Sequence, residues 1–385
     1  MAAVRGVDAG RPPSPRLAGW GLLVDRWDRR PGSNALRALS LPESDSPMVS
    51  PIHILITEPL DRELIDRVIS VSPRLAVHQH PARRVDDLPS ALVAQAEVLY
   101  TLDALPEPAS APCLRWVQFH LAGLDRFGQH PLLRAGVQFT SLSGAAVPQM
   151  GEYVILMMLA LSHELPEMAA FKASKEWPKD RWERFSPREL RGATVGIVGY
   201  GSVGREVARL CRAFGARVLA IKNDAMHAED PGFIPEGLGD PPGDLPERIY
   251  PPESLRRVLA ESDFILVCTP LTPRSRSLLG ADALSGAKKG AFLIDVSRGG
   301  LLEEGAVLRA IREGILAGAA LDVFAQEPLP AESPLWDEPR VILSPHIAGV
   351  SRAYDARATD LFVANLRRYL LSQPLLNRFD PARGY

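Results

Sequence analysis

Cysteine is scarce in this chain, and neither sign of charge dominates it. Its 385 residues include only three cysteines, Cys113, Cys211 and Cys268, whose wide spacing matches no disulfide framework or zinc site. We therefore expect no metal centre and a reducing, cytoplasmic environment, with Cys211 and Cys268 as buried, inert thiols. The formal net charge of -2 argues against a surface that binds nucleic acid.

Long hydrophobic runs are also missing. No apolar stretch is long enough to span a bilayer, so we expect no membrane partner. The composition is otherwise ordinary, with 46% hydrophobic and 23% charged residues. A chain of this length can form two domains, each with its own core.

The first fifty residues lack a sustained pattern of either helix or strand. They are rich in arginine, proline and serine, and their one apolar cluster (17–24) is interrupted by glycines and too short for a signal sequence. We predict a disordered extension over residues 1–50. A translation start at Met48 is the alternative, and a targeting role stays open.

The chain is organised around residues 194–215, which read TVGIVGYGSVGREVARLCRAFG. A short apolar strand leads into Gly199, Gly201 and Gly204, a G-x-G-x-x-G pattern, and a helix with apolar residues at helical spacing follows up to Gly215. Such a turn lets backbone N–H groups approach a pyrophosphate at the positive end of a helix. The pattern alone is weak, but the flanking strand and helix favour a dinucleotide site over an ordinary tight turn.

Strands and helices alternate before this stretch, which predicts a parallel sheet covered by helices. The expected strands are 52–57, 75–80, 97–101, 116–120 and 137–140, and a helix is expected at 60–71. Ala122 and Gly123 form a turn after one strand, at the edge where such sheets bind ligands. Residues 147–165 form the longest apolar helical pattern, typical of a helix buried between two domains. The polar, tryptophan-bearing stretch 175–191 then leads to the glycine turn.

A second alternating region follows the glycine turn. It begins with a strand at 216–222 and a long proline- and glycine-rich loop at 223–250. Further strands are expected at 264–269, 291–296, 319–323 and 341–344, and helices at 253–261, 281–287 and 303–313. A closing helix at 352–371 is expected to return to the first domain.

Three polar residues follow late strands of this second sheet: Arg298, Glu327 and His346. In an open parallel sheet, such strand ends meet at the crevice that holds the dinucleotide. Arginine binds a carboxylate in two-point fashion, and histidine beside a carboxylate exchanges protons near neutral pH. Each residue singly has a structural explanation, but the combination after a nucleotide turn favours carbonyl reduction.

The chain resembles the NAD(P)-dependent D-isomer-specific 2-hydroxyacid dehydrogenase family. The resemblance rests on TVGIVGYGSVGREVA, CTPLTPRSRSLL, LIDVSRGGLLEEGAVLRAIREGILAGAALDVFAQEPLP and SPLWDEPRVILSPHIAG, and it covers nearly everything from residue 52 onward. It implies an α/β protein with two doubly wound parallel-sheet domains, a Rossmann-type cofactor domain and a flavodoxin-like substrate domain, separated by a cleft. We expect the substrate domain at 51–148 and 350–385, and the cofactor domain at 149–349.

The resemblance also implies roles for individual residues. Arg298 would hold the substrate carboxylate with the backbone of Ala122 and Gly123, His346 would donate the proton, and Glu327 would be its partner. The implied cofactor residues are Gly199, Gly201, Ser202, Val203, Gly204, Lys222, Thr269, Pro270, Val296, Arg298 and Asp322, the last at the nicotinamide carboxamide. Structural roles are expected for His120 and His163.

Lys222 departs from the family's pattern. NAD-preferring members carry an acid at the end of this strand, which binds the ribose 2′-hydroxyl. A lysine attracts a 2′-phosphate instead, so we predict that NADPH is preferred or at least accepted, although a solvent-directed Lys222 and the nearby Asp224 and Asp230 argue the other way.

These observations predict an oxidoreductase that transfers a hydride between NAD(P)(H) and a small 2-oxo or 2-hydroxy acid. The substrate is expected to be glyoxylate- or hydroxypyruvate-like, with D-specificity. The alternative is a corepressor-like protein on the same fold that senses NAD(H). The resemblance further implies a homodimer, with 147–183 as the candidate interface.

Overall fold

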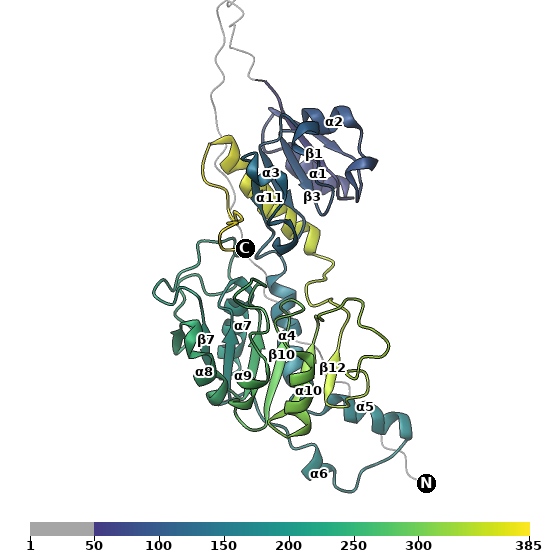
Figure 1. Cartoon of the computed structure of the whole chain (residues 1–385), viewed down its shortest axis with the longest axis vertical. Helices are drawn as coiled ribbons and strands as arrows, with labels where there is room; N and C mark the ends of the chain where they lie inside the picture. The colour runs from purple at the N-terminus through teal and green to yellow at the C-terminus, as the bar shows by residue number, and fades with distance from the viewer. Residues whose placement is uncertain (1–49) are drawn as a thin grey trace, which may run out of the picture. The chain divides into compact units, whose positions relative to one another are not determined.

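The computed structural model describes residues 50–385, which contain two parallel β-sheets (Figure 1). The prediction of a disordered extension therefore lies almost wholly outside the described residues. Each sheet is formed by a continuous part of the chain, the first up to residue 140 and the second from residue 194. The predicted domain boundaries at 148–149 and 349–350 stay a prediction; both fall outside the strands of the two sheets.

The first sheet has five strands in the order β2-β1-β3-β4-β5, all parallel. Its strands are β1 (Ile52–Ile56), β2 (Leu75–Gln79), β3 (Val98–Thr101), β4 (Trp116–Phe119) and β5 (Gln138–Thr140). This is the flavodoxin-like order that the resemblance implied. The inner strands β1, β3 and β4 are almost wholly buried, as a parallel sheet covered by helices requires, whereas His78 and Gln79 of the edge strand β2 are exposed.

The second sheet has seven strands in the order β12-β11-β10-β9-β6-β7-β8, again all parallel. Its strands are β6 (Thr194–Val198), β7 (Arg217–Ile221), β8 (Arg248–Tyr250), β9 (Phe264–Val267), β10 (Ala291–Asp295), β11 (Leu316–Leu321) and β12 (Val341–Leu343). The chain runs outward from β6 in one direction and then resumes at β9 on its other side. The predicted Rossmann order is confirmed, and its switch point lies at the end of β6.

The helices lie where the apolar spacing placed most of them. They are α1 (Arg62–Ile69), α2 (Ser90–Gln95), α3 (Pro131–Arg134), α4 (Val147–Ser162), α5 (Leu165–Ser174), α6 (Arg181–Arg184), α7 (Ser202–Ala213), α8 (Leu255–Glu261), α9 (Ala281–Ser285), α10 (Glu304–Arg312) and α11 (Tyr354–Leu370).

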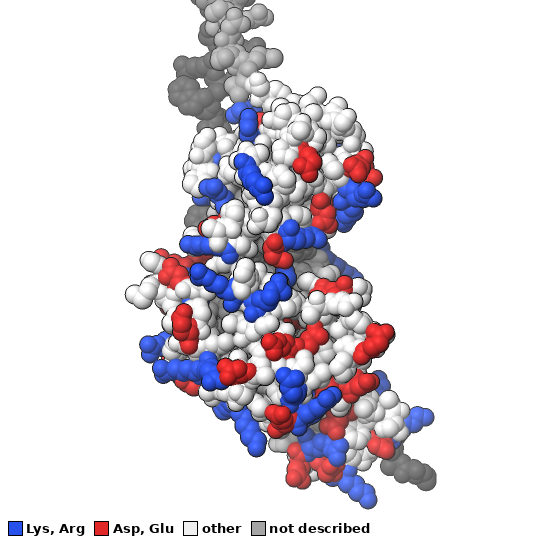
Figure 2. All heavy atoms as spheres, in the orientation of Figure 1, with Lys and Arg blue, Asp and Glu red and all other residues white. Residues whose placement is uncertain are grey.

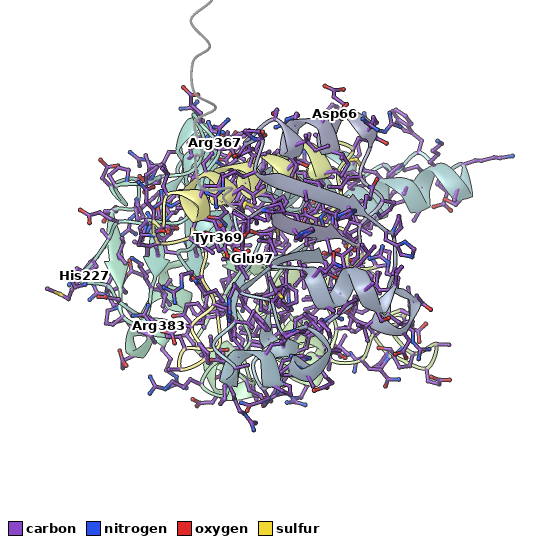
Figure 3. The ribbon with its side chains drawn as sticks, turned by 90° about the horizontal axis from the view of Figure 1, so that it is seen from above. Asp66, Glu97, His227, Arg367, Tyr369 and Arg383 are labelled. Atoms are coloured by element: carbon purple, nitrogen blue, oxygen red, sulfur yellow. The ribbon has the colours of Figure 1, made fainter. Side chains whose placement is uncertain are left out.

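Helix α11 returns to the first sheet, as predicted. It packs against α1, and its Phe362 and Leu366 are fully buried in the same core cluster as Trp116. The Tyr369 hydroxyl donates a hydrogen bond of 2.6 Å to Glu97 (Figure 3). The end of the chain therefore completes the first domain.

The long apolar pattern 147–165 is not one helix, which corrects the prediction. Helix α4 ends at Ser162, Glu164 adopts a left-handed backbone (φ 53°), and α5 begins at an angle of 61° to α4. Helix α4 packs on α7, β10 and β11, yet its Leu156 is 52% exposed, so its apolar surface is not buried all round. No single helix of residues 50–385 is long and apolar enough to cross a membrane; only the bent pair α4 and α5 has that length and composition.

Two further boundaries differ from the predictions. Strand β11 covers 316–321 rather than 319–323, because its pairing with β10 begins at Leu316 in a region of small residues. The loop predicted at 223–250 ends in a strand, β8, which extends the sheet beyond β7. On the face shown in Figure 2, acidic and basic side chains are interspersed, in keeping with the small net charge.

Candidate active site

The glycine turn lies at the switch point between β6 and α7. Gly199 has φ +110°, and a Cβ there would come within 2.7 Å of the Thr269 nitrogen. A Cβ on Gly204 would overlap the Gly199 carbonyl. These two glycines therefore let the loop after β9 and helix α7 pack directly on the turn, which side chains would prevent.

Gly201 has a different function. A Cβ on this residue would meet nothing within 4 Å, so it faces open space. Among the described residues, none accepts a hydrogen bond from the backbone N–H of Gly201, Ser202 or Val203. Free N–H groups at the positive end of a helix, beside open space, fit the pyrophosphate of a dinucleotide.

The loops after β7 and β9 flank the glycine turn, and the predicted place of the adenosine beside them stays a prediction. Thr269 and Pro270 follow β9 directly, where Cys268 donates to the Gly199 carbonyl at 3.1 Å. Lys222 follows β7, and its ammonium donates to the carbonyls of His227 and Glu229, the latter at 3.1 Å. Lys222 is therefore not directed at open solvent, and burial lowers its pKa.

His346 and Glu327 meet after strands β12 and β11. His346 Nδ1 lies 2.8 Å from Glu327 Oε2. Burial alone raises the pKa of Glu327, but the hydrogen bonds from His346 and the Phe324 amide, with the charges of His346 and Arg298, lower it overall. Because an ionised carboxylate only accepts, Nδ1 carries the hydrogen of this bond. Nε2 has no hydrogen-bond partner among residues 50–385, so it is available to a substrate.

Asp322 fixes the turn that carries His346. Its carboxylate is 1% exposed and accepts hydrogen bonds from Ser344 Oγ and from the amides of Ile347 and Ala348. His346 itself adopts φ 55° and donates its N–H to the Asp322 carbonyl at 2.9 Å. A left-handed histidine is costly, and these bonds hold it in place. The predicted contact of Asp322 with a nicotinamide stays a prediction.

Arg298 reaches from the second sheet to the glycine turn of the first. Its guanidinium lies directly over Gly123, where a Cβ would overlap it, and its Nε is 3.7 Å from Asp125. The N–H groups of Ala122 and Gly123 donate to none of the described residues. Arg298 also donates from one terminal nitrogen to the Ser297 carbonyl at 2.8 Å. The free N–H groups of Ala122 and Gly123 beside this guanidinium form a set of donors that suits a carboxylate.

Val296 and Asp295 precede Arg298 at the end of β10. Val296 is buried and donates its N–H to Val267 at 3.1 Å. Burial raises the pKa of Asp295 to about 7, against hydrogen bonds from Ser297 that lower it, and nearby Asp322 raises it further. Asp295 was not predicted as a site residue. The sequence shows an aspartate within an apolar strand, but it does not show that the carboxylate is buried.

The two other histidines singled out in the sequence lie outside this group. His120 contacts the Tyr100 hydroxyl at 2.6 Å and Asp355 at 3.3 Å, and burial lowers its pKa. His163 is exposed at the end of α4. Cys211 is buried as predicted, whereas Cys268 is half-buried. Burial raises the pKa of both thiols to about 12, and the charge of Asp295 adds to the shift at Cys268.

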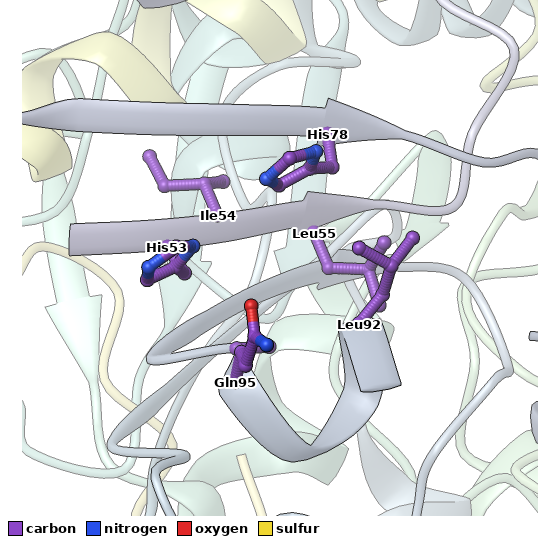
Figure 4. A pocket seen from close by; sticks show the side chains of 7 residues that line it. His53, Ile54, Leu55, His78, Leu92 and Gln95 are labelled. Atoms are coloured by element: carbon purple, nitrogen blue, oxygen red, sulfur yellow. The ribbon is translucent and has the colours of Figure 1, made fainter. Parts of the chain in front are cut away.

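A small recess occurs in the first sheet, away from these groups. It lies beside the amino-terminal half of β1, where the imidazole rings of His53 and His78 stack with centroids 6.0 Å apart (Figure 4). The strands of this sheet present their carboxyl ends to the Arg298 region, so this recess is remote from it. No cluster of three or more metal-ligating side chains occurs within residues 50–385.

The glycine turn, the histidine–glutamate pair and the arginine over Gly123 define a two-sheet dehydrogenase that uses a nicotinamide dinucleotide. The profile of the family "D-isomer specific 2-hydroxyacid dehydrogenase, NAD binding domain" matches residues 155–348. This chain belongs to that family, and is therefore an NAD(P)-dependent oxidoreductase acting on 2-hydroxy or 2-oxo acids.

Individual relatives agree with this assignment. A glyoxylate reductase of Aeropyrum pernix is 33% identical over 283 residues, 71% of this chain and 79% of that protein. A D-isomer specific 2-hydroxyacid dehydrogenase from Xanthobacter autotrophicus, solved with NADPH and MES, superposes with a TM-score of 0.70 at 27% identity, covering 88% of this chain and all of the other. An NADPH-dependent glyoxylate/hydroxypyruvate reductase from Sinorhizobium meliloti, solved with NADP and sulfate, has a TM-score of 0.67 at 26% identity. The match covers 87% of this chain and 100% of that protein.

Proposed function

We propose that this protein reduces a small 2-oxo acid of the glyoxylate or hydroxypyruvate kind to the D-2-hydroxy acid. The observation that carries the proposal is the grouping of Arg298, Glu327 and His346 after strands β10 to β12, with the Arg298 guanidinium over Gly123 of the first sheet. The names of the two reductases above support the substrate class.

In this proposal Arg298 binds the substrate carboxylate, assisted by the free N–H groups of Ala122 and Gly123. Two-point binding by the guanidinium fixes the carbonyl carbon and oxygen, which lowers the entropy cost of reaction. The bound NAD(P)H supplies the hydride to the carbonyl carbon.

His346 then donates the proton from Nε2 to the carbonyl oxygen as the alkoxide forms. Glu327 accepts the hydrogen bond from Nδ1–H, which fixes the orientation of the ring and leaves Nε2 as the atom that exchanges the proton with the substrate. The proton lost to the product is replaced from solvent, because the His346 side chain is 44% exposed. In the reverse direction Nε2 accepts the hydroxyl proton.

We propose that NADPH is accepted as the cofactor, bound by Gly199, Gly201, Ser202, Val203, Gly204, Thr269, Pro270, Val296 and Asp322. Support comes from the lysine that replaces an acid after β7 and from neighbours solved with NADPH or NADP. Because Lys222 donates to two backbone carbonyls, its contribution to binding a 2′-phosphate is limited to the attraction of a fixed positive charge. Comparing kcat/KM for NADPH and NADH in wild type and Lys222→Gln tests this, and a wild type that turns over with NADH but not with NADPH contradicts it.

We further propose a homodimer formed through α4, α5 and the segment up to α6. This region carries exposed apolar side chains that its own fold leaves uncovered, namely Leu156, Leu165, Met168, Trp177 and Trp182. Exposed apolar side chains concentrated in one region mark an interface. Sedimentation of wild type and Trp177→Ser/Trp182→Ser tests this, and a monomeric wild type contradicts it.

The corepressor-like alternative receives no support from the relatives above. A cytoplasmic location fits the three free cysteines of the described residues and stays part of the proposal. The decisive test is a panel of glyoxylate, hydroxypyruvate, pyruvate and 3-phosphohydroxypyruvate with NADPH and NADH, with chiral analysis of the product. Arg298→Ala serves as the inactive control, and a wild type that reduces none of these acids overturns the proposal.

A further inference from the structure

The last residues of the chain lie against the cofactor domain, although they follow the helix that completes the substrate domain. Phe379 donates its N–H to the Phe139 carbonyl at 2.9 Å and is buried in the core of the first sheet. From this anchor the chain runs on to Tyr385, whose hydroxyl accepts a hydrogen bond of 3.2 Å from the Asn223 amide. The segment 377–385 thus links the two sheets.

Asn377 forms a second link between them. Its side-chain carbonyl accepts a hydrogen bond of 3.1 Å from the Phe233 N–H in the loop after β7, and its amide donates to the Ser143 carbonyl at 2.7 Å. Asn377 adopts φ 53°, a conformation that asparagine tolerates better than most residues. Phe233 itself packs on a small apolar cluster that includes Leu142 and Leu361.

The end of the segment bridges the two loops that border the adenosine side of the dinucleotide site. Asn223 comes directly after Lys222 at the end of β7. A Cβ on Gly384 would lie 3.8 Å from the methyl group of Thr272, which belongs to the loop after β9. Hydrogen bonds from Gly384 and Asp380 close the segment into a turn, Gly384 to Asp380 at 2.8 Å and Asp380 to Tyr385 at 3.1 Å. Figure 3 shows Arg383 of this turn on the same side of the molecule as His227 of the loop after β7.

The Tyr385 side chain is not used by the protein core. It is 43% exposed, and among the described residues its hydroxyl has a single partner, the Asn223 amide, which donates to it. A flat aromatic ring held at the mouth of an adenosine site presents a face on which a purine stacks, and such stacking contributes substantially to nucleotide binding.

We infer that Tyr385 is a cofactor-binding residue, supplied by the substrate domain, which covers the adenosine half of the bound dinucleotide. The inference rests on the proposed function only in taking the loops that contain Lys222 and Thr272 as the border of the adenosine site. It also gives the segment 377–385 a reason to cross between the domains, since adenosine binding then engages both of them.

The test measures binding without catalysis, by titration calorimetry of the full-length protein with 2′,5′-ADP and with 5′-AMP. We expect Tyr385→Ala to weaken 2′,5′-ADP binding about 10-fold, in line with the loss of one base–aromatic stack. Tyr385→Phe keeps the ring and loses only the Asn223 bond, so a change of about 2-fold is expected. In turnover assays Tyr385→Ala should raise KM for the dinucleotide while kcat stays within about 2-fold.

Phe214→Ala is the matched control. Phe214 has nearly the same exposure, 41%, but lies at the opposite end of α7 from the glycine turn, so its removal should leave binding unchanged. Thermal melting of each variant checks that the fold is retained. Unchanged or tighter nucleotide binding by Tyr385→Ala, or a wild type that binds neither nucleotide, overturns the inference. A wild type that binds 2′,5′-ADP but reduces no 2-oxo acid refutes the proposed function alone.

Discussion

The two sheets contribute to the site in different ways. The second sheet presents side chains already held by bonds within its own domain, such as His346 by Glu327 and the 344–348 turn by Asp322. The first sheet presents mainly backbone, the open N–H groups of Ala122 and Gly123. The second sheet therefore contributes the side chains of the proposed mechanism, Arg298 included, and the first sheet contributes backbone donors beside Arg298.

The polar residues of the first sheet's carboxyl edge illustrate the contrast. Glu58 is 3% exposed and accepts hydrogen bonds from Arg83 and from the Leu102 amide. His120 is occupied by Tyr100 and Asp355. The hydrogen-bonding groups of these side chains are already paired within the first domain. They therefore stabilise that domain and are not available for proton transfer.

The largest effect is expected for the proton donor. In the proposed mechanism His346→Ala removes the group that protonates the carbonyl oxygen, so kcat should fall about 10²- to 10⁴-fold, whereas KM for the 2-oxo acid should change little. Steady-state kinetics measure both constants. Activity within about 5-fold of wild type would show that the second sheet does not supply the acid.

The next largest effect should come from Gly123→Ala. The added methyl group would overlap the Arg298 guanidinium, which must then move away from the first sheet. We expect kcat/KM to fall about 10²-fold, because misplacing a binding group by about 1 Å has an effect of that size. Gly305→Ala in α10 is the control, since a Cβ there meets nothing closer than 3.7 Å. Equal activities of the two variants would contradict the placement of Arg298.

Asp295 should make stability depend on pH. Burial raises its pKa to about 7, so the folded protein keeps this carboxyl protonated at pH values where the unfolded chain has already ionised it. Its contribution to stability is therefore complete at low pH and is lost as the pH rises through 7. The unfolding free energy of Asp295→Asn minus that of wild type should therefore increase by about 1–3 kcal/mol as the pH is raised from 5 to 8.

Asp263 at the amino end of β9 is the matched control for this measurement. Burial favours a raised pKa for Asp263, but Lys288, the Thr194 amide and Arg188 lower it overall. Its contribution is present at neutral pH and is lost on acidification, so Asp263→Asn should be less stable than wild type at pH 8. Urea denaturation across this pH range compares the two variants, and the same pH trend in both would contradict the assignment.

The smallest effect on catalysis is expected for His120→Phe. Losing the bonds to Tyr100 and Asp355 should cost about 1–3 kcal/mol of unfolding free energy, with kcat within about 3-fold of wild type. Denaturant unfolding and kinetics on the same preparation test both statements. A large loss of kcat at unchanged stability would give the first sheet a chemical function.

The sequence could predict those site residues that stand at the ends of strands within long motifs. Arg298, Glu327 and His346 stand at the ends of strands within long motifs, and topology alone brings such ends together. Gly199, Gly201 and Gly204 could be predicted for the same reason, because they follow a strand within a long motif. Both strand orders followed from the family resemblance, because the alternation itself indicates parallel sheets without fixing their order.

Other features depend on packing between distant segments. Asp295 is visible as a residue, but its burial beside Asp322 is not. Lys222 stands out in the sequence, yet its bonds to His227 and Glu229 depend on how an irregular loop folds back, and its contact with a cofactor stays a prediction. The break at Glu164 was missed because the apolar pattern continues through it, whereas the backbone there is left-handed. Tyr385 could not be linked to Asn223, since 162 residues separate them.

The central claim is that Arg298 recognises a substrate carboxylate at the Gly123 turn. The most direct test compares kcat/KM for glyoxylate and for acetaldehyde, which keeps the aldehyde but replaces the carboxylate with a methyl group, in wild type and in Arg298→Ala. We predict that wild type prefers glyoxylate at least about 10³-fold and that this preference falls to below about 10-fold in the variant. A variant that is slower on both substrates but keeps the wild-type preference would contradict the claim.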